Sequence, residues 1–341
     1  MKNKPNISLF NLAELHSSGL FLAVRKGMNE ILNRSIHKHN QVISAMPKSS
    51  YKPIISVIIC TSGRQQLALN AINSILNENF TDFEIILVNN NPDNFDHAQF
   101  GGSVKYMHEP IQGLSRARNR GAQAASGEFL LYIDDDAIAC ENLLSSIHSA
   151  FLNHPDMAII GGQIFLKIPE FAEEIVLEGK EALWSAYTVS YKHLKEVREQ
   201  YEFPYGACFA IRHSVLDKIG GFPHSYGRCG NNYAGGEETA VCFAAKKLGF
   251  KIGIEPSAAV LHCVSADRFT HEHIRKTTRE SILTTYRLSC DGYSDCGWTP
   301  RYVDERLSII RKELEKASGL SAFYKQCEYD AFSELKEIIN L

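Results

Sequence analysis

The first half of the chain alternates apolar runs with segments whose apolar residues recur at helical spacing. Ile54–Cys60 is a nearly unbroken β-branched run, which is typical of a strand buried on both faces of a sheet. Leu67–Leu76 has the apolar spacing of a helix, and Phe83–Val88 predicts a second buried strand. A helix over Leu114–Ala125 and a strand over Phe129–Ile133 follow. This alternation predicts an α/β fold with helices on both faces of the sheet.

The rest of the chain carries further strand and helix signals. Strands are predicted over Met157–Leu166, Ala207–Ile211 and Ala258–Val264. A helix over Glu237–Leu248 is stopped by Gly249, a residue type that tolerates a left-handed cap. Three more helices are predicted near the C-terminus, over Ile274–Leu288, Val303–Leu314 and Ala322–Ile339.

These patterns divide the chain into three parts. We expect an N-terminal helical extension and linker at residues 1–50, an α/β domain at 51–265, and a C-terminal helical region at 266–341. Within the domain, residues 51–165 and 166–265 form two halves. Polar loops follow the strands of the first half, at Thr61–Arg64, Asn89–Pro92 and Asp134–Asp136. Because loops at the carboxyl ends of parallel strands converge, a ligand site is expected there.

Composition excludes several classes of protein. The 341 residues are 44% hydrophobic, which is ample for a core and excludes general disorder. Lys and Arg total 36 against 39 Asp and Glu, and the net charge of −3 argues against a dedicated nucleic-acid binder. No apolar run approaches the roughly 18–20 residues that span a bilayer, and Leu20–Val24 is too short for a secretion signal. Nine scattered cysteines favour reduced thiols in a cytosolic protein.

Three consecutive carboxylates, Asp134, Asp135 and Asp136, follow a predicted buried strand. Like charges this close repel one another, and a bound divalent cation would offset the repulsion. Carboxylate oxygens suit Mg²⁺ or Mn²⁺, and side chains that alternate along the strand end point Asp134 and Asp136 the same way. The alternative is a solvated acidic loop that caps the next helix near Asn142.

The ordered set of motifs resembles glycosyltransferase family 2. The likeness extends from about residue 53 to 270 and is carried by Ile55–Arg64, Glu84–Asn90, Gly113–Gly121, Gly127–Asp136, Gly206–Arg212, Gly220–Phe222, Gly235–Thr239, Leu248–Phe250, Pro256 and His262. The resemblance implies a glycosyltransferase A-type fold, with a Rossmann-like, mixed and mostly parallel sheet. It also implies transfer of a sugar from a nucleotide-sugar donor with inversion.

The resemblance assigns roles to individual residues. It puts Asp134 near the ribose and Asp136 on the metal, with His262 completing the shell of Mn²⁺ or Mg²⁺; the alternative for His262 is a core histidine on a strand edge. The acidic pair Glu237-Glu238 matches a pair that is more often Glu-Asp in the family. Glu238 is therefore our predicted general base and Glu237 the alternate, whereas acids in a first helical turn also serve to complement the helix dipole.

Donor binding is predicted for the first two loops and the Asp motif. Thr61 is expected on the base or ribose, and Arg64 on the diphosphate oxygens. Asn89 stands where the family usually has an Asp that reads uracil, and Arg118 resembles an arginine that supports the donor pocket. Asp134 and Asp135 complete the predicted donor-binding set. Turn formation by Asn89 and a solvated helix-face charge for Arg118 stay open as alternatives.

Partners follow from the same resemblance. A UDP-sugar is the favoured donor, and the acceptor is a carbohydrate, a lipid-linked glycan or a peptide. Acceptor-site candidates are the aromatic residues Trp184, Tyr187, Tyr191 and Tyr205, for which packing is the alternative. A Gly- and Asn-rich loop at 226–236 is expected to close over the donor. We expect a cytoplasmic protein, with docking at the inner face of the membrane and homo-oligomerisation both left open.

Three rival functions remain at this stage. A degenerate family member would bind sugar nucleotide without turnover. A metal-dependent, phosphatase-like enzyme also places Asp-x-Asp after a buried strand, but here Ala137-Ile138 follows the acids late in the chain. A nucleotidyltransferase would need a longer Gly-rich basic loop than Thr61–Arg64 after the first strand.

Overall fold

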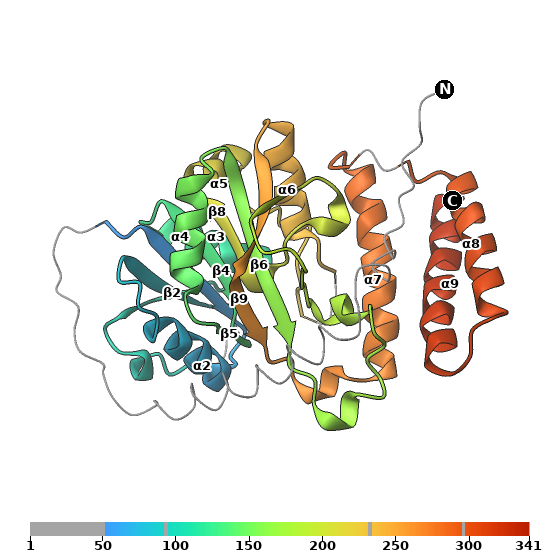
Figure 1. Cartoon of the computed structure of the whole chain (residues 1–341), viewed down its shortest axis with the longest axis horizontal. Coiled ribbons are helices and arrows are strands. Elements are labelled where there is room, and N and C mark those ends of the chain that lie inside the picture. The colour runs from blue at the N-terminus through green and yellow to red at the C-terminus, as the bar shows by residue number, and fades with distance from the viewer. Residues whose placement is uncertain (1–51, 92–94, 231–233, 295–296, 341) are drawn as a thin grey trace.

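The computed structural model describes residues 52–91, 95–230, 234–294 and 297–340, so the predicted helical extension at 1–50 lies outside the described residues (Figure 1). The strands are β1 (Ile55–Thr61), β2 (Phe83–Asn89), β3 (Val104–His108), β4 (Phe129–Asp134), β5 (Ala137–Ala139), β6 (Met157–Leu166), β7 (Lys195–Val197), β8 (Phe209–Arg212) and β9 (Lys251–His262). The helices are α2 (Gln65–Leu76), α3 (Leu114–Ala124), α4 (Leu143–Asn153), α5 (His213–Ile219), α6 (Glu237–Lys247), α7 (His271–Cys290), α8 (Pro300–Leu314) and α9 (Gly319–Ile339).

The described strands form one sheet in the order β3-β2-β1-β4-β8-β6-β9-β5, and β7 pairs with β9. β1 is parallel to β2 and β4, and β2 is parallel to β3. Parallel strands were predicted for the first half, although β3 itself was not. β6 and β9 are also parallel. β8 runs antiparallel to β4 and β6, and β5 and β7 run antiparallel to β9. The sheet is therefore mixed, and within the described residues antiparallel pairs are as numerous as parallel ones.

Helices cover both faces of the sheet because its central strands are apolar on both sides. In β1, Ile55, Val57 and Ile59 pack in one cluster with buried residues of α2 and α4. Ile58 points the other way and packs in a second cluster with residues of α3, α5 and α6. Successive side chains of an extended strand point to opposite faces of the sheet. Because helices cover both faces, nearly every residue of β1 must be apolar, as the sequence shows.

The C-terminal helices form a separate bundle beside the sheet. Figure 1 shows α7 between the sheet and the hairpin of α8 and α9. Buried Ile282, Val303, Ile310 and Phe332 join the three helices in one apolar cluster. None of the helices in the described part of the chain combines the length and the apolar sequence that a bilayer span requires.

Most predicted elements are present, with shifted boundaries. The last predicted strand begins earlier, at Lys251, and Ala207-Cys208 lie in a short 3₁₀ turn that precedes β8. Four elements were not predicted: β3, β5, β7 and α5. β5 and β7 have three residues each and α5 has seven, so their patterns are too short to recognise.

Candidate active site

A cluster of three potential metal ligands lies at the carboxyl end of β4. The chain turns after Asp134 and returns as β5, whose Ala137 pairs with His262 at the end of β9. This pairing brings Asp134, Asp136 and His262 together, so that one ligand atom of each lies within 4.8 Å of the others. Asp136 and His262 are buried, and Asp134 is partly exposed. The alternative in which the Asp motif caps α4 is not what the structure shows, since Glu78 accepts from the first amide of that helix.

The orientation of His262 fits a cation. Its Nδ1 lies 2.9 Å from the carbonyl oxygen of Trp184, which only accepts, so Nδ1 carries the hydrogen. In a neutral ring, Nε2 is then an acceptor that faces Oδ1 of Asp136 at 3.1 Å. Either a proton on Nε2 or a bound cation must therefore lie between these two atoms. A carboxylate oxygen and an imidazole nitrogen are both suitable ligands, so Asp136 and His262 would together hold a divalent cation.

Thr61 and Arg64 fix the Asp motif to the end of β1. The hydroxyl of Thr61 donates to Oδ2 of Asp135 at 2.6 Å, and Nε of Arg64 donates to the same oxygen at 3.0 Å. Arg64 also donates from Nη2 to Asp135 and from Nη1 to Asp136, the latter at 2.9 Å. Asp135 is buried, and Thr61 and Arg64, which were predicted to bind the donor, both contact it directly.

The pKa values of Asp135 and Asp136 are shifted in opposite directions. Burial raises the pKa of Asp135 to about 7, although Arg64 and the Thr61 hydrogen bond oppose the rise. Burial would also raise the pKa of Asp136, but the contact with His262 and the charge of Arg64 outweigh it and hold this pKa well below its usual range. Asp136 therefore stays ionised, which is the form that a metal ligand requires.

Arg118 connects the Asp motif with the acidic pair on α6. Its side chain is 3% exposed, and its Nη1 donates to Oε1 of both Glu237 and Glu238 at 2.7 Å. Its Nη2 lies 3.6 Å from Oδ1 of Asp134. The structure thus gives Arg118 ion-pair contacts with three carboxylates, and it is not a solvated helix-face charge.

The two glutamates have different surroundings. The side chain of Glu237 is 3% exposed, and its Oε2 is buried with no hydrogen-bond partner among the described residues. Burial, together with the charge of Glu238, raises the pKa of Glu237 to about 8 against the opposing effect of Arg118. Glu238 is 15% exposed. The pair therefore consists of one buried carboxyl group and one that reaches the surface of a cleft.

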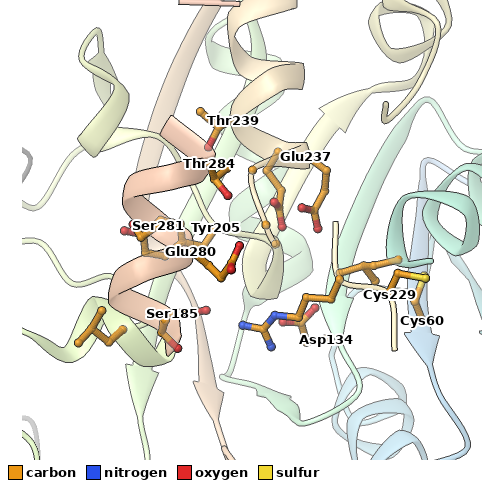
Figure 2. Close-up of a pocket in the computed structure, with 18 of the residues that line it drawn as sticks. Cys60, Asp134, Ser185, Tyr205, Cys229, Glu237, Thr239, Glu280, Ser281 and Thr284 are labelled. Atoms are coloured by element: carbon orange, nitrogen blue, oxygen red, sulfur yellow. The ribbon is translucent and has the colours of Figure 1, made fainter. Parts of the chain in front are cut away.

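The three potential metal ligands and the acidic pair line one cleft of about 650 Å³. Figure 2 shows Asp134 and Glu237 facing this space, with Glu280 and Ser281 extending from the helix on the other side. The predicted site residues that line the cleft are Thr61, Arg64, Arg118, Asp134, Asp135, Asp136, Glu237, Glu238 and His262. Of the described part of the 226–236 loop, Arg228, Gly230, Gly235 and Gly236 also line it; residues 231–233 lie outside the described range.

Among the residues predicted to bind the donor, hold the metal or act in catalysis, Asn89 alone does not line the cleft. Its carboxamide is buried and donates to the carbonyl oxygen of Asn91 at 3.2 Å. Asn90 lines the cleft instead, and its carboxamide holds the carbonyl groups of Glu109 and Ile111. Successive side chains at a strand end point to opposite sides, and this alternation was a signal available in the sequence.

Of the four aromatic residues predicted for the acceptor site, some line the cleft and others do not. Tyr205 lines the cleft. Trp184 is buried and stacks on Phe269, and the hydroxyl of Tyr187 donates to the carbonyl oxygen of Glu202. Tyr191 is not among the residues that line the cleft within the described part of the chain. Packing is therefore the observed environment of Trp184 and Tyr187.

Two further groups of residues line the cleft, and of these the sequence had suggested Arg268, on a polar loop after His262, as a residue that closes over the diphosphate. The first is basic: Arg228 and Arg268 line the cleft, and Nη2 of Arg268 is buried without a partner among the described residues. Burial lowers the pKa of Arg268 to about 10, and the charge of Arg228 adds to the effect. The second group belongs to α7, which the sequence placed in a separate helical region. Nothing in the local pattern of α7 marks it as part of a site.

Residues 56–220 match the family model of Glycosyl transferase family 2. A glucosyl-dolichyl phosphate glucuronosyltransferase of Haloferax volcanii is 26% identical over 224 residues, which cover 61% of this chain and 68% of that protein. A GalNAc(5)-diNAcBac-PP-undecaprenol beta-1,3-glucosyltransferase of Campylobacter jejuni is 34% identical over 103 residues, or 28% of this chain and 33% of that protein. The chain spans less than half the length of several other curated relatives that it matches.

One solved structure shares the fold of this chain. It is a mannosyltransferase from Pyrobaculum calidifontis in complex with GDP-Man and Mn²⁺. The TM-score is 0.56 at 14% sequence identity, and the alignment covers 98% of this chain and 99% of that one. At this identity the likeness establishes the glycosyltransferase A-type fold alone.

Proposed function

Because this chain belongs to glycosyltransferase family 2 and is therefore a transferase enzyme, we propose that it moves a sugar from a nucleoside-diphosphate sugar to an acceptor hydroxyl with inversion. The observation that carries the proposal is the joining of two clusters in one cleft. Asp134, Asp136 and His262 lie close enough together to hold a divalent metal, and Arg118 links Asp134 to the acidic pair. Departure of a diphosphate and deprotonation of an acceptor require these two kinds of group side by side.

The metal side of the cleft would receive the donor. Asp134, Asp136 and His262 would hold Mn²⁺ or Mg²⁺, which, when bound, neutralises the charge that develops on the leaving diphosphate. Arg64, Arg228 and Arg268 line the same cleft and supply further positive charge for diphosphate oxygens. The unpartnered Nη2 of Arg268 supports this assignment, because a buried donor group without a partner is costly.

The other donor contacts stay predictions. Thr61 and Asp135 bind each other at the edge of the cleft, and we propose that they position Arg64 for the donor. Recognition of the base by Asn89, and the preference for UDP over other nucleotides, rest on the sequence resemblance alone.

Glu238 is our proposed general base. Among the described residues, Arg118 binds its Oε1, so Oε2 is left for the acceptor. As the acceptor oxygen forms its bond to the anomeric carbon, the bond from that carbon to the diphosphate oxygen breaks and the hydroxyl proton moves to Glu238. Glu237 is buried with a raised pKa and is the less suitable proton acceptor at neutral pH.

The acceptor class follows from the names of relatives. Those of the Haloferax and Campylobacter proteins contain a dolichyl phosphate and a diphosphate-linked undecaprenol. We therefore propose a glycan acceptor, lipid-linked in the cell, with the enzyme working at the cytoplasmic face of a membrane. A peptide acceptor, homo-oligomerisation and the membrane contact itself stay predictions of the sequence.

The test is nucleoside-diphosphate release from a panel of UDP-, GDP- and dTDP-sugars with Mn²⁺, measured by chromatography. We expect one sugar nucleotide to be consumed, and Glu238→Gln to lower the rate by about 10²–10⁴-fold while donor affinity is kept. Glu237→Gln is the matched control and is expected to retain more activity than Glu238→Gln. Full activity of Glu238→Gln would overturn the base assignment, and binding without turnover by the wild type would favour the degenerate-transferase alternative.

A further inference from the structure

One wall of the cleft is a polar face of α7. Thr277, Glu280, Ser281 and Thr284, called here the α7 stripe, recur at positions i, i+3, i+4 and i+7 and all line the cleft. Leu283 is buried among the residues of α8 and α9, and so is Ile282, which also borders the cleft. The helix is therefore amphipathic, with its polar face turned to the cleft and not to bulk solvent alone.

The α7 stripe is held close to the acidic pair. A Cβ atom built on Gly236, the residue before Glu237, would lie 2.5 Å from Cγ2 of Thr284 and 3.5 Å from Cδ1 of Leu288. Gly236 has φ of +99°, which also favours glycine. The absence of a side chain there lets the helix approach the start of α6. The stripe consequently has a fixed position relative to Glu237 and Glu238.

The chemistry of this wall matches an uncharged polyol. Figure 2 shows the carboxylate of Glu280 extending into the cleft, with the hydroxyl groups of Ser281 and Thr284 on the same helix. Across the cleft, Glu237 offers a buried Oε2 that has no partner among the described residues. Carboxylate and hydroxyl oxygens accept hydrogen bonds from sugar hydroxyls.

Within the described residues, no Lys or Arg of α7 lines the cleft. The cations that do line it belong to other segments, such as Arg64 beside the Asp motif and Arg228 in the 226–236 loop. On α7 itself, Arg279 and Arg287 contact Glu280, and Arg287 donates to the hydroxyl of Thr284, so the carboxylate of the stripe is charge-paired, which suits a site for a neutral sugar. We propose that the α7 stripe is the subsite for the terminal, uncharged sugar of the acceptor; this inference rests on the proposed function.

Glu280 is the specificity-determining residue of this subsite. Arg279 donates to its Oε1, and Nη2 of Arg287 lies 3.7 Å from its Oε2. These contacts fix the carboxylate, and each oxygen has a further lone pair for a sugar hydroxyl. Ser281 is exposed on the next position of the same face and adds a neutral hydrogen bond. Neither residue takes part in bond breaking, so both act on acceptor binding.

The experiment measures transfer from the preferred sugar nucleotide, with Mn²⁺, to the octyl β-glycosides of glucose, galactose, mannose and N-acetylglucosamine. We expect at least one glycoside to accept sugar. Glu280→Gln should raise the KM for that glycoside about tenfold and Ser281→Ala about threefold, because the first loses a charged hydrogen bond and the second a neutral one. The KM for the donor should change much less than the KM for the glycoside. Glu272→Gln, on the exposed side of the same helix, is the matched control and should change neither constant.

Three results would overturn the inference. An unchanged glycoside KM in both variants would show that the stripe does not contact the acceptor. Equal rises in both KM values would show that α7 supports the whole cleft and has no special relation to the acceptor. A wild-type enzyme that hydrolyses the donor but uses none of the glycosides would show that the acceptor is not a neutral sugar, while the proposed function stands. Failure to bind or consume any sugar nucleotide would instead overturn the proposed function and this inference with it.

Discussion

Gly206 provides a direct test of whether the ion pair between Arg118 and Glu238 must be fixed. A Cβ atom at position 206 would lie within 3.0 Å of Nη2 and Cζ of Arg118 and of Oε1 of Glu238. Ordinary contacts of a Cβ atom begin near 3.4 Å. Gly206→Ala therefore pushes both charged groups away from the positions in which they share a 2.7 Å hydrogen bond.

The expected effect is large on catalysis and small on stability. Both groups must move by on the order of 1 Å, and a displacement of this size in an active site costs about 10²-fold in rate. The atoms that move are the ends of side chains, so the backbone of the sheet need not shift. We expect a fall in kcat/KM of about 100-fold, which is about 2.7 kcal/mol of transition-state stabilisation, with a loss of about 1 kcal/mol in unfolding free energy, the low end of the usual cost of overpacking.

The assay is steady-state release of the nucleoside diphosphate, together with urea unfolding of the same preparations. Gly102→Ala is the control, since a Cβ atom there meets nothing within 4 Å and its φ is not positive. The reasoning is refuted if Gly206→Ala keeps activity within about threefold of wild type, or if its activity and stability fall together as in a misfolded protein. Either outcome would mean that the position of the ion pair does not limit the reaction.

Two further predictions concern the carboxylates. Asp136→Asn should remove the Mn²⁺ dependence of nucleotide-sugar binding and lower the affinity at least about tenfold, because a metal ligand is lost. Titration calorimetry with and without EDTA measures the affinity. If EDTA leaves the affinity of the wild type unchanged, the prediction is wrong. The folded pKa of Glu237, about 8, exceeds its ordinary value of 4.5, so the folded state binds the extra proton and stability should fall as pH rises from about 4.5 to 8. Glu237→Gln should flatten this decline in urea unfolding free energy; an identical slope in both proteins would show that Glu237 is not its source.

The sequence alone predicted the scaffold of the site well. Continuous apolar runs such as Ile54–Cys60 located the buried strands, because a strand covered on both faces has no polar alternation. The rule that strand ends converge then placed Thr61, Arg64 and the Asp motif at one edge of the sheet, and the structure brings them into direct contact. His262 joins them through the antiparallel pairing of β5 with β9, which the sequence did not predict.

What could not be predicted depends on contacts between distant segments. Arg118 meets Glu237 across 119 residues, and no local pattern distinguishes such an arginine from a solvated one. The α7 stripe has an ordinary amphipathic sequence, and only the packing of Thr284 against Gly236 shows that its polar face borders a cleft. Asn89 was predicted from the family resemblance, whereas the orientation of the last side chain of β2, which decides between Asn89 and Asn90, depends on the folded strand.

Glu237 and Glu238 differ in their proposed roles because both contact the single guanidinium group of Arg118. Arg118 contacts Asp134, Glu237 and Glu238, so three ionised carboxylates would leave a net charge of −2 around one buried cation. Burial raises the pKa of Glu237 to about 8, and a proton held there at neutral pH reduces this excess. Arg118 then balances mainly Asp134, on the metal side, and Glu238, on the acceptor side. Two adjacent residues of the same type can thus differ in role because their environments differ, and Gln at position 237 should resemble the protonated acid more closely than Gln at position 238 resembles a base.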